Sequence, residues 1–201
     1  RQLDDELQAL GPFAERVRAA RQGPVLPPQP VLLMLNLDGK PWALQGSLPD
    51  LRAEGQLRWR YDELKPADRL QAWILHLALC SAAPAGVAPR TTWLARDERL
   101  SLRPADAPND HLATLLRLYA QGLCEPLRFF PRSAWTWVDT QGHDGKTRAA
   151  WLPRRDGWAE GSDRAYRLAL RGQGDVLDQR FQQLAHQVFD PLRAHIEDDA
   201  R

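Results

Sequence analysis

The chain has 201 residues, enough to bury one hydrophobic core, and we expect a single domain over residues 1–201. Its 27 basic and 26 acidic side chains give a formal net charge of +1, which excludes recruitment of nucleic acid by a bulk positive field. Any contact with DNA must therefore be local. Its 2 cysteines are too few for a disulfide framework, and no apolar run reaches the length of a membrane span. A reducing cytoplasm fits these features best.

The first 30 residues read as helix followed by an extended connector. Apolar residues recur at helical intervals from Leu3 to Val17, and Gly11-Pro12 interrupts them, so we expect two short helices or one kinked helix. Four prolines within residues 24–30 forbid a helix and predict an extended connector.

A core of residues 31–138 follows. Apolar segments 31–37 and 41–48 flank Asp38-Gly39, a strong signal for a two-residue hairpin turn. A third strand is predicted over residues 56–61, so three antiparallel strands precede a helix that opens at Pro66. A further hairpin is predicted over residues 91–103.

The rest of the chain is predicted to be mainly helical. Pro108-Asn109-Asp110 begins a helix, whereas the aromatic-rich segment 129–138 reads as a strand. Residues 139–162 have no period and are predicted to be a loop, and helices close the chain over 163–201. The fold class is thus α/β (α+β), with a central mixed sheet flanked by helices.

A literal PD…ExK string is present, in which Pro49-Asp50 is followed by Glu63-Leu64-Lys65. The acid and the lysine of such a site must project from the middle of a rigid strand so that they converge on one metal-bound phosphate. Glu63 and Lys65 fall past the predicted strand, in a polar run that reads as the start of a helix. An active Mg²⁺-dependent nuclease that uses Asp50, Glu63 and Lys65 is therefore the alternative hypothesis.

His76 and Cys80 lie four residues apart on one predicted helix, a spacing that permits two metal ligands. No second pair of ligands lies nearby in the sequence. A packed core His and Cys is the preferred interpretation, because free cysteines are usually buried.

The stretch that contains these strings resembles the core of PD-(D/E)xK nucleases. The letters GSL at 46–48 fit the first strand of that family, but Pro49 stands where its metal-binding Asp belongs, and the second strand, LRWRY at 57–61, offers no carboxylate. Gln71 remains of the family's Gln/Tyr pair, since Leu75 replaces the Tyr. The resemblance implies a restriction-endonuclease-like core without catalytic residues, metal or cofactor, and we expect the Gln71 amide to bond backbone near the strand ends.

A closer resemblance covers nearly the whole chain. The strings GSLPDLRAEGQLRWR, LQAWILHLALCSA, GLCEPLRFFPRSAW and FDPLRAHI are similar to segments of the C-terminal domain family of RecC, the gamma subunit of exodeoxyribonuclease V. An initial Arg1 rather than Met fits a piece of a longer protein. The resemblance implies an inactivated nuclease-like domain, not an enzyme itself, within the bacterial RecBCD helicase–nuclease.

What this family resemblance implies for partners is specific. Such a domain would help to split a double-stranded DNA end with a protruding pin, guide the separated single strands, and pack against the RecB and RecD subunits. The work is mechanical, so it needs neither a metal nor a strong basic field, which agrees with the net charge near zero.

Two turns lie next to the positions where the nuclease family has its catalytic residues, and they are predicted to be exposed and to touch DNA. One is Asp38-Gly39-Lys40, and the other spans residues 51–55. A two-residue period would also align two arginines of the next strand along one phosphate track. The candidates are Lys40, Trp42, Arg52, Arg58 and Arg60. The alternative is that the arginines pair with Glu54 and Asp62 or simply solubilise a sheet face.

The chain holds 8 tryptophans, several of them interleaved with arginines. Such a pattern suits stacking on bases, and it also suits protein interfaces. For any single Trp, packing in the core or at an interface is the preferred interpretation, because most large aromatic side chains are structural. The Trp-rich segment 140–162 is the second choice for a surface that handles DNA.

Overall fold

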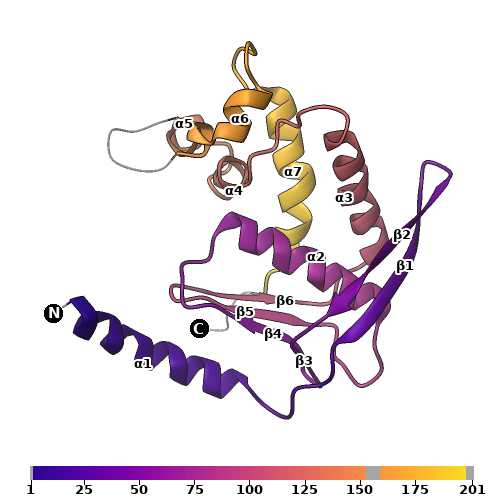
Figure 1. Ribbon diagram of the computed structural model, residues 1–201, viewed down its shortest axis with the longest axis vertical. Helices are drawn as coiled ribbons and strands as arrows, with labels where there is room; N and C mark the ends of the chain where they lie inside the picture. The colour runs from indigo at the N-terminus through magenta and orange to yellow at the C-terminus, as the bar shows by residue number, and fades with distance from the viewer. Residues whose placement is uncertain (1, 153–158, 198–201) are drawn as a thin grey trace. The chain divides into compact units, whose positions relative to one another are not determined.

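The computed structural model describes residues 2–152 and 159–197, with side chains from Leu10 onward. Figure 1 labels its helices and strands along the chain. The strands are β1 (Gln29–Leu37), β2 (Lys40–Leu48), β3 (Leu51–Arg52), β4 (Gly55–Trp59), β5 (Thr91–Leu94) and β6 (Arg99–Leu102). The helices are α1 (Gln2–Ala20), α2 (Pro66–Ala82), α3 (Pro108–Gly122), α4 (Pro131–Asp139), α5 (Asp144–Trp151), the 3₁₀ turn η1 (Glu160–Ser162), α6 (Arg164–Ala169) and α7 (Gln179–Ala194).

The described residues form two compact units. The sheet unit draws on residues 1–64, 71–113 and 195–201, and the helical unit on residues 65–70 and 114–194. Helices α2 and α3 contribute residues to both units. The predicted single domain over 1–201 stays a prediction.

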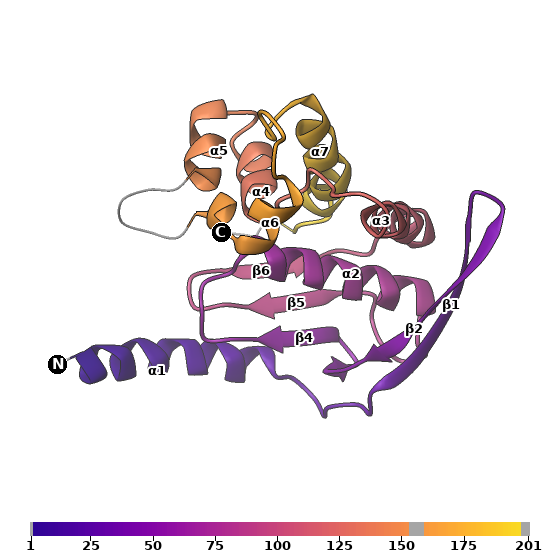
Figure 2. The same ribbon diagram turned by 45° about the horizontal axis from the view of Figure 1, so that its top comes forward.

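The sheet unit is built on a four-stranded sheet of order β3-β4-β5-β6. Strands β4 and β5 run parallel and the other pairs are antiparallel, so the sheet is mixed. A parallel pair needs a crossover, and α2 supplies it. Figure 2 shows α2 on one face of this sheet and α1 on the other. The predicted fold class, a mixed sheet flanked by helices, is confirmed.

Helix α1 is one continuous helix that keeps Pro12 inside it, in place of two short helices. Its apolar side buries Phe13 and Val17 against Leu57 and Leu94 of the sheet. The Arg16 guanidinium donates to the carbonyl oxygens of the turn that joins β5 to β6, at Ala95 (3.0 Å) and Arg96 (2.7 Å). The helix is therefore fixed to one face of the sheet by burial and by hydrogen bonds.

Strands β1 and β2 form a separate two-stranded ribbon, and β2 does not continue into the main sheet. The prediction of three consecutive antiparallel strands is therefore wrong, because β4 pairs with β5 and with the very short β3 instead. The hairpin itself is confirmed. Asp38 and Gly39 take positive φ angles of 53° and 81°, as the tightest hairpin turns require.

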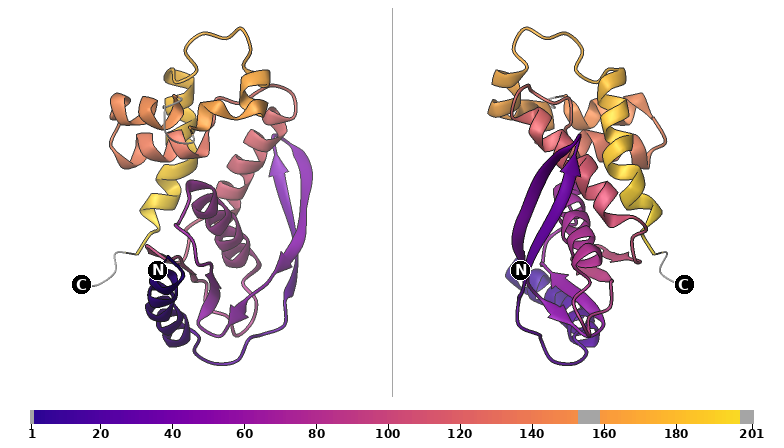
Figure 3. Two further views of the ribbon diagram at one scale, coloured as in Figure 1. Left: turned by 60° about the vertical axis from the view of Figure 1, so that its left-hand side comes forward. Right: turned by 90° about the vertical axis from the view of Figure 1, so that its right-hand side faces the viewer.

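The helical unit corrects two predictions. Residues 129–138 are not a strand, because Pro131 opens helix α4 there, and α4 packs against α5 and α7. Residues 139–162 are not simply a loop, since α5 and η1 lie within them, although residues 153–158 fall outside the described chain. Figure 3 shows these helices gathered around the upper part of α7.

One carboxylate explains why α4 forms where the aromatic residues favour a strand. Glu160 is buried, and its two oxygens accept hydrogen bonds from the backbone N–H groups of Arg132 (2.9 Å) and Ser133 (2.7 Å). Those are orphan donors in the first turn of α4, and a negative charge there also suits the helix dipole. Helix period then buries Ala134 and Val138 in the helical unit.

No helix within the described part of the chain has both the length and the apolar character needed to cross a lipid bilayer.

Candidate nucleic-acid interface

The hairpin turn presents the first two candidate residues. The Asn36 side chain accepts the N–H of Gly39 (2.8 Å), which stiffens the turn, and Lys40 is exposed just beyond it. Trp42 is half-buried on the same strand and lies opposite Leu35 in the register. The start of β2 therefore presents the Lys40 ammonium group and part of the Trp42 ring on a ribbon with a defined backbone geometry.

The other face of this ribbon is apolar and open. Leu32 and Met34 are each 64% exposed, whereas their neighbours Val31 and Leu35 point to the buried side. Large apolar side chains that gather on an exposed ribbon are typical of surfaces that meet another protein.

Arg52 is not on the surface, so the expectation of an exposed Arg52 is wrong. The residue is only 4% exposed, and its guanidinium donates to the carbonyl oxygens of Gln22 (3.3 Å) and Gly23. These carbonyls belong to the connector, two and three residues past the last residue of α1. Arg52 thus ties the connector to β3.

Arg58 and Arg60 are engaged by the protein itself. The Arg58 guanidinium lies 4.9 Å from the centre of the Trp93 ring, and its Nε is 3.4 Å from the Asp50 carboxylate. Arg60 lies one residue past β4 and pairs with Asp62 at 3.6 Å. The predicted pairing with Asp62 is confirmed, while Arg58 pairs with Asp50 and not with Glu54. Both guanidinium groups remain partly exposed, at 26% and 45% of their side chains.

The residues of the alternative nuclease site have separate surroundings. Asp50 lies in the turn between β2 and β3 and pairs with Arg58, whereas Glu63 follows β4 and pairs with Arg96 at 3.2 Å. Lys65 directly precedes α2, and its backbone N–H donates to Asp68. The prediction that Glu63 and Lys65 lie past the strand is confirmed. Within the described residues, no three His, Cys, Asp or Glu side chains lie close enough to hold a metal ion.

Gln71 contradicts its predicted role. It is exposed on α2, and none of the described residues forms a hydrogen bond with its side chain. The helix that carries it is present from Pro66, but the glutamine lies on the exposed side of that helix. Its survival in the sequence therefore has no structural account here.

His76 is a core residue, as predicted. Its Nε2 lies 2.9 Å from the Arg103 carbonyl, so Nε2 carries the hydrogen, and its Nδ1 accepts from the Thr91 hydroxyl at 3.1 Å. The Cys80 sulfur lies 3.5 Å from Nε2. Burial lowers the pKa of His76 to about 4, against the opposing effect of the Arg103 carbonyl, and the charge of the nearby His195 lowers it further. Both ring nitrogens are occupied by the protein.

Several tryptophans lie elsewhere than predicted. Trp135, Trp137 and Trp151 are on helices α4 and α5, not on strands or loops. Trp135 packs edge-on against Phe189, and Trp151 stacks near Phe130, in line with the preferred interpretation of structural packing. Trp158 falls outside the described residues.

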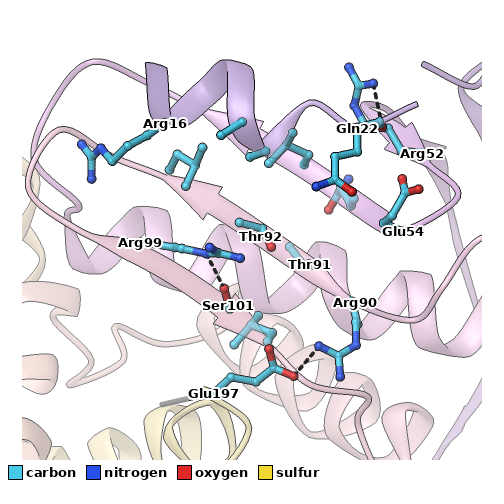
Figure 4. Close-up of a pocket in the computed structure, with 17 residues that line it drawn as sticks. Arg16, Gln22, Arg52, Glu54, Arg90, Thr91, Thr92, Arg99, Ser101 and Glu197 are labelled. Carbon is cyan, nitrogen blue, oxygen red and sulfur yellow. Dashed lines mark hydrogen bonds and ion pairs between the residues drawn. The ribbon is translucent and has the colours of Figure 1, made fainter. Parts of the chain in front are cut away.

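A pocket that the sequence did not reveal lies on the sheet face next to α1, with a volume of about 460 Å³. Figure 4 shows its polar lining, in which Arg99 and Ser101 come from β6 and Thr92 from β5. Arg16 and Glu197 also line it, from nearly opposite ends of the chain. The alternation of polar residues on the predicted hairpin 91–103 was a possible signal, but no local pattern could bring those distant residues to it.

Comparison with known proteins decides which family the chain represents. A family model described as the RecC C-terminal domain matches residues 1–142. The chain belongs to the RecC C-terminal domain family. The match includes β1 to β6, α1 to α3 and the whole of α4.

Two relatives of this RecC domain agree. The RecBCD enzyme subunit RecC of Escherichia coli (strain K12) is 30% identical over 139 residues, which are 68% of this chain and 12% of the relative. The RecBCD enzyme subunit RecC of Buchnera aphidicola subsp. Acyrthosiphon pisum (strain APS) is 24% identical over 105 residues, 52% of this chain and 10% of the relative. The chain thus spans roughly a tenth of the length of the relatives that it matches.

Proposed function

We propose that this RecC C-terminal domain is a non-catalytic module of a RecBCD enzyme, acting in DNA repair and recombination in the bacterial cytoplasm. It would help to separate the strands of a duplex end, guide them, and contact the RecB and RecD subunits. The observation that carries the proposal is the β1–β2 hairpin, an independently paired ribbon with a tight, hydrogen-bonded turn, found in a chain of this family.

A hairpin suits strand separation because a wedge has to be stiff and needs no metal. The positive φ angles of Asp38 and Gly39 define one turn conformation, and Lys40 stands beside it to meet a phosphate. Trp42 supplies an aromatic surface on the same strand, and aromatic side chains stack on bases without sequence preference. Arg58 and Arg60, still partly exposed, are proposed as further contacts.

The exposed apolar face of the same ribbon supports the proposal of subunit contacts. Leu32 and Met34 would be covered in an assembled enzyme, because exposed apolar patches of this kind mark interaction sites. The free thiols of Cys80 and Cys124 are compatible with a reducing compartment.

The proposal is tested in a complete RecBCD assembly whose RecC subunit carries Lys40→Ala, Arg58→Ala and Arg60→Ala together. Arg52 is left unchanged, because it is buried and its hydrogen bonds tie the connector to β3. We expect slower unwinding of blunt duplex and an unchanged ATPase rate on single strands. The control exchanges three exposed arginines of the helical unit for alanine: Arg164, Arg167 and Arg171. Unchanged unwinding in the test variant, or a loss caused only by failed assembly, would contradict the proposal.

The absence of catalysis is part of the proposal and has its own test. Asp50 and Glu63 are held by different arginines, which gives no support to a shared metal site. We expect Asp50→Ala and Lys65→Ala to leave the Mg²⁺-dependent cleavage of plasmid DNA by the assembled enzyme unchanged. Cleavage that both substitutions abolish would establish the nuclease alternative.

A further inference from the structure

The pocket beside α1 is independent of the hairpin turn and of the pairs formed by Asp50 and Glu63. Helix α1 covers part of one face of the sheet, where it buries Leu57 and Leu94, and the pocket opens on the same face beside it. Its walls come from α1, the connector, the β3–β4 turn, β5, β6 and the segment after α7. Its volume of about 460 Å³ is within the range of sites for small organic groups.

The lining is rich in arginines, and most of them have no carboxylate partner among the described residues. Arg16 and Arg52 are hydrogen-bonded to backbone carbonyls, which carry no charge of their own to neutralise a guanidinium. Within the described part of the chain, Arg90 is the one lining arginine in an ion pair with a lining acid, Glu197, at 2.7 Å. Among the described lining residues four arginines thus face two glutamates, and the local charge is positive although the chain is nearly neutral.

The polar centre of the pocket is formed by two neighbouring strands. Thr92 and Ser101 are direct partners in the β5–β6 register, so their side chains lie on the same face of the sheet. Arg99 is two residues before Ser101 on β6, and its Nε donates to the Ser101 hydroxyl at 3.0 Å. The terminal nitrogens of Arg99 make no hydrogen bond to any described residue. Figure 4 shows the three side chains grouped on the strands at the centre of the pocket.

Guanidinium and hydroxyl donors grouped on one face of a sheet match a phosphate. Arginine, serine and threonine side chains are the common donors to nucleic-acid phosphates, and the planar guanidinium can bind two oxygens at once. A carboxylate offers fewer oxygens to donors arriving from different directions. The apolar part of the lining, Leu57 and Leu102 with Ala19 and Ala20, suits a sugar ring.

We propose that this pocket binds a backbone phosphate of a single nucleic-acid strand, with Arg99, Ser101 and Thr92 as its donors. The choice of nucleic acid as the carrier of the phosphate rests on the proposed function. None of these three donors is among the DNA-contact residues of the proposed function, although Arg52, a candidate from the sequence, lines the pocket. The pocket therefore adds a second point at which a separated strand is held.

The test measures the binding of fluorescein-labelled oligothymidine to the full-length RecC subunit by fluorescence anisotropy over a range of salt concentrations. We expect Arg99→Gln to raise the Kd about three- to tenfold at low salt and to reduce the slope of log K against log salt by about 0.7, as the loss of one phosphate contact on a single strand requires. Ser101→Ala should raise the Kd less, because Arg99 remains.

The matched control is Arg96→Gln, which removes the same charge from the same hairpin. Arg96 is exposed, pairs with Glu63 and does not line the pocket. We expect its Kd to change less than about twofold, because an exposed ion pair contributes little. Equal losses in Arg96→Gln and Arg99→Gln would indicate a diffuse positive field and overturn the site.

Competitors identify the occupant. If polyglutamate displaces the oligothymidine and loses its own binding in Arg99→Gln, the site takes an acidic protein segment and the proposal is wrong. If inorganic phosphate binds at Arg99 while oligothymidine binding does not depend on that residue, the site takes a small anion only, which also overturns it. Binding of oligothymidine that depends on Arg99 and resists both competitors supports it.

The outcomes also separate this pocket from the proposed function. Normal binding in Arg99→Gln together with slow unwinding in the hairpin variant would remove the pocket and keep the function of the hairpin. Weakened binding in Arg99→Gln together with normal unwinding in the hairpin variant would keep the pocket and remove the wedge.

Discussion

At the scale of single residues, the sheet unit keeps a neutral histidine in its interior. His76 is fully buried, and its two nitrogens are bonded to Thr91 and to the Arg103 carbonyl. Trp73 stacks on it at a ring separation of 5.8 Å, and the ring of His195 lies 5.1 Å from Trp73. A second proton on the His76 ring would convert Nδ1 from an acceptor into a donor that faces the Thr91 hydroxyl. It would also place a positive charge in the core.

The buried His76 predicts acid-sensitive stability. Its folded-state pKa, about 4, lies below the ordinary value of 6.5, so in the range between them the unfolded chain binds the extra proton. The free energy of unfolding should therefore fall as the pH falls, by about 2 kcal/mol between pH 7 and pH 5, and level off below the folded-state pKa. Urea unfolding followed by tryptophan fluorescence measures it.

The control for this prediction is His76→Gln, which can still donate and accept. We expect it to be less stable at pH 7 but less sensitive to acid, with the remaining sensitivity due to His111, whose pKa is also lowered, mainly by burial and then by the charge of His195. The carboxyls of Glu125 and Asp175 have lowered pKa values and titrate below this window. An unchanged pH dependence in the variant would contradict the assignment to His76.

The sequence predicted some residue roles and missed others for a physical reason. His76 was predictable as a core residue, because it shares a helical face with apolar neighbours. Arg52 was not, because its burial depends on carbonyls of the connector some thirty residues earlier. The same holds for Gln71, whose helix was predictable but whose exposure depends on how α2 lies against the sheet. Local sequence patterns therefore predict whether a segment is a helix or a strand. The burial and the hydrogen-bond partners of a single side chain depend on residues from distant segments.

At the scale of elements, the β3–β4 turn requires a glycine. Gly55 has a φ of +125°, and a Cβ atom there would lie 2.3 Å from the Arg90 carbonyl oxygen and 3.2 Å from that of Ala88. The same strand end is held to this segment by the bond from the Gln56 N–H to Arg90. This close approach holds the loop before β5 against the start of β4, and it also forms one wall of the pocket.

We therefore predict that Gly55→Ala lowers the free energy of unfolding by more than about 2 kcal/mol, because it adds both backbone strain and a steric clash. Gly39→Ala is the matched control, since Gly39 also has a positive φ, +81°, but its missing Cβ would meet open space. Backbone strain alone should cost about 1 kcal/mol there. Equal costs at the two glycines would show that contact with Arg90 does not limit the turn.

The helical unit depends on one cap from a distant segment. Glu160 accepts two backbone N–H groups of α4, and a neutral amide in its place could accept only one and would turn an N–H toward the other. Glu160→Gln should lower the free energy of unfolding by about 1–3 kcal/mol, measured by urea unfolding. Glu125→Gln, at an exposed pair with Arg180, should cost clearly less, because an exposed ion pair contributes little. Similar losses in both variants would contradict the capping role.

At the scale of the whole chain, local signals predicted most helices and hairpins but not the strand order. The β1–β2 and β5–β6 hairpins follow from adjacent segments, and both were predicted. The parallel pairing of β4 with β5 joins segments separated by all of α2, and no short pattern reports it. The helix in segment 129–138 is secured by Glu160, which follows the segment by more than twenty residues. The local aromatic pattern does not include this residue, and it predicted a strand.

The family match and the structure divide the chain in related ways. The match over residues 1–142 includes every strand, the hairpin turn and the proposed phosphate pocket except for Glu197. Helices α5, α6 and α7 of the helical unit lie beyond it. The features on which the proposed function rests therefore belong to the part of the chain that the family shares.

The central claim is that the β1–β2 hairpin meets DNA where a duplex end is split. Its most direct test is photo-crosslinking in a complete RecBCD assembly bound to a blunt duplex, with p-benzoylphenylalanine in place of Lys40 at the turn and, as the reference, in place of the exposed Arg171. We predict crosslinks from position 40 to nucleotides at the end of the duplex, and none from position 171. Crosslinks from position 40 to protein subunits alone, or equal DNA crosslinking at both positions, would contradict the account.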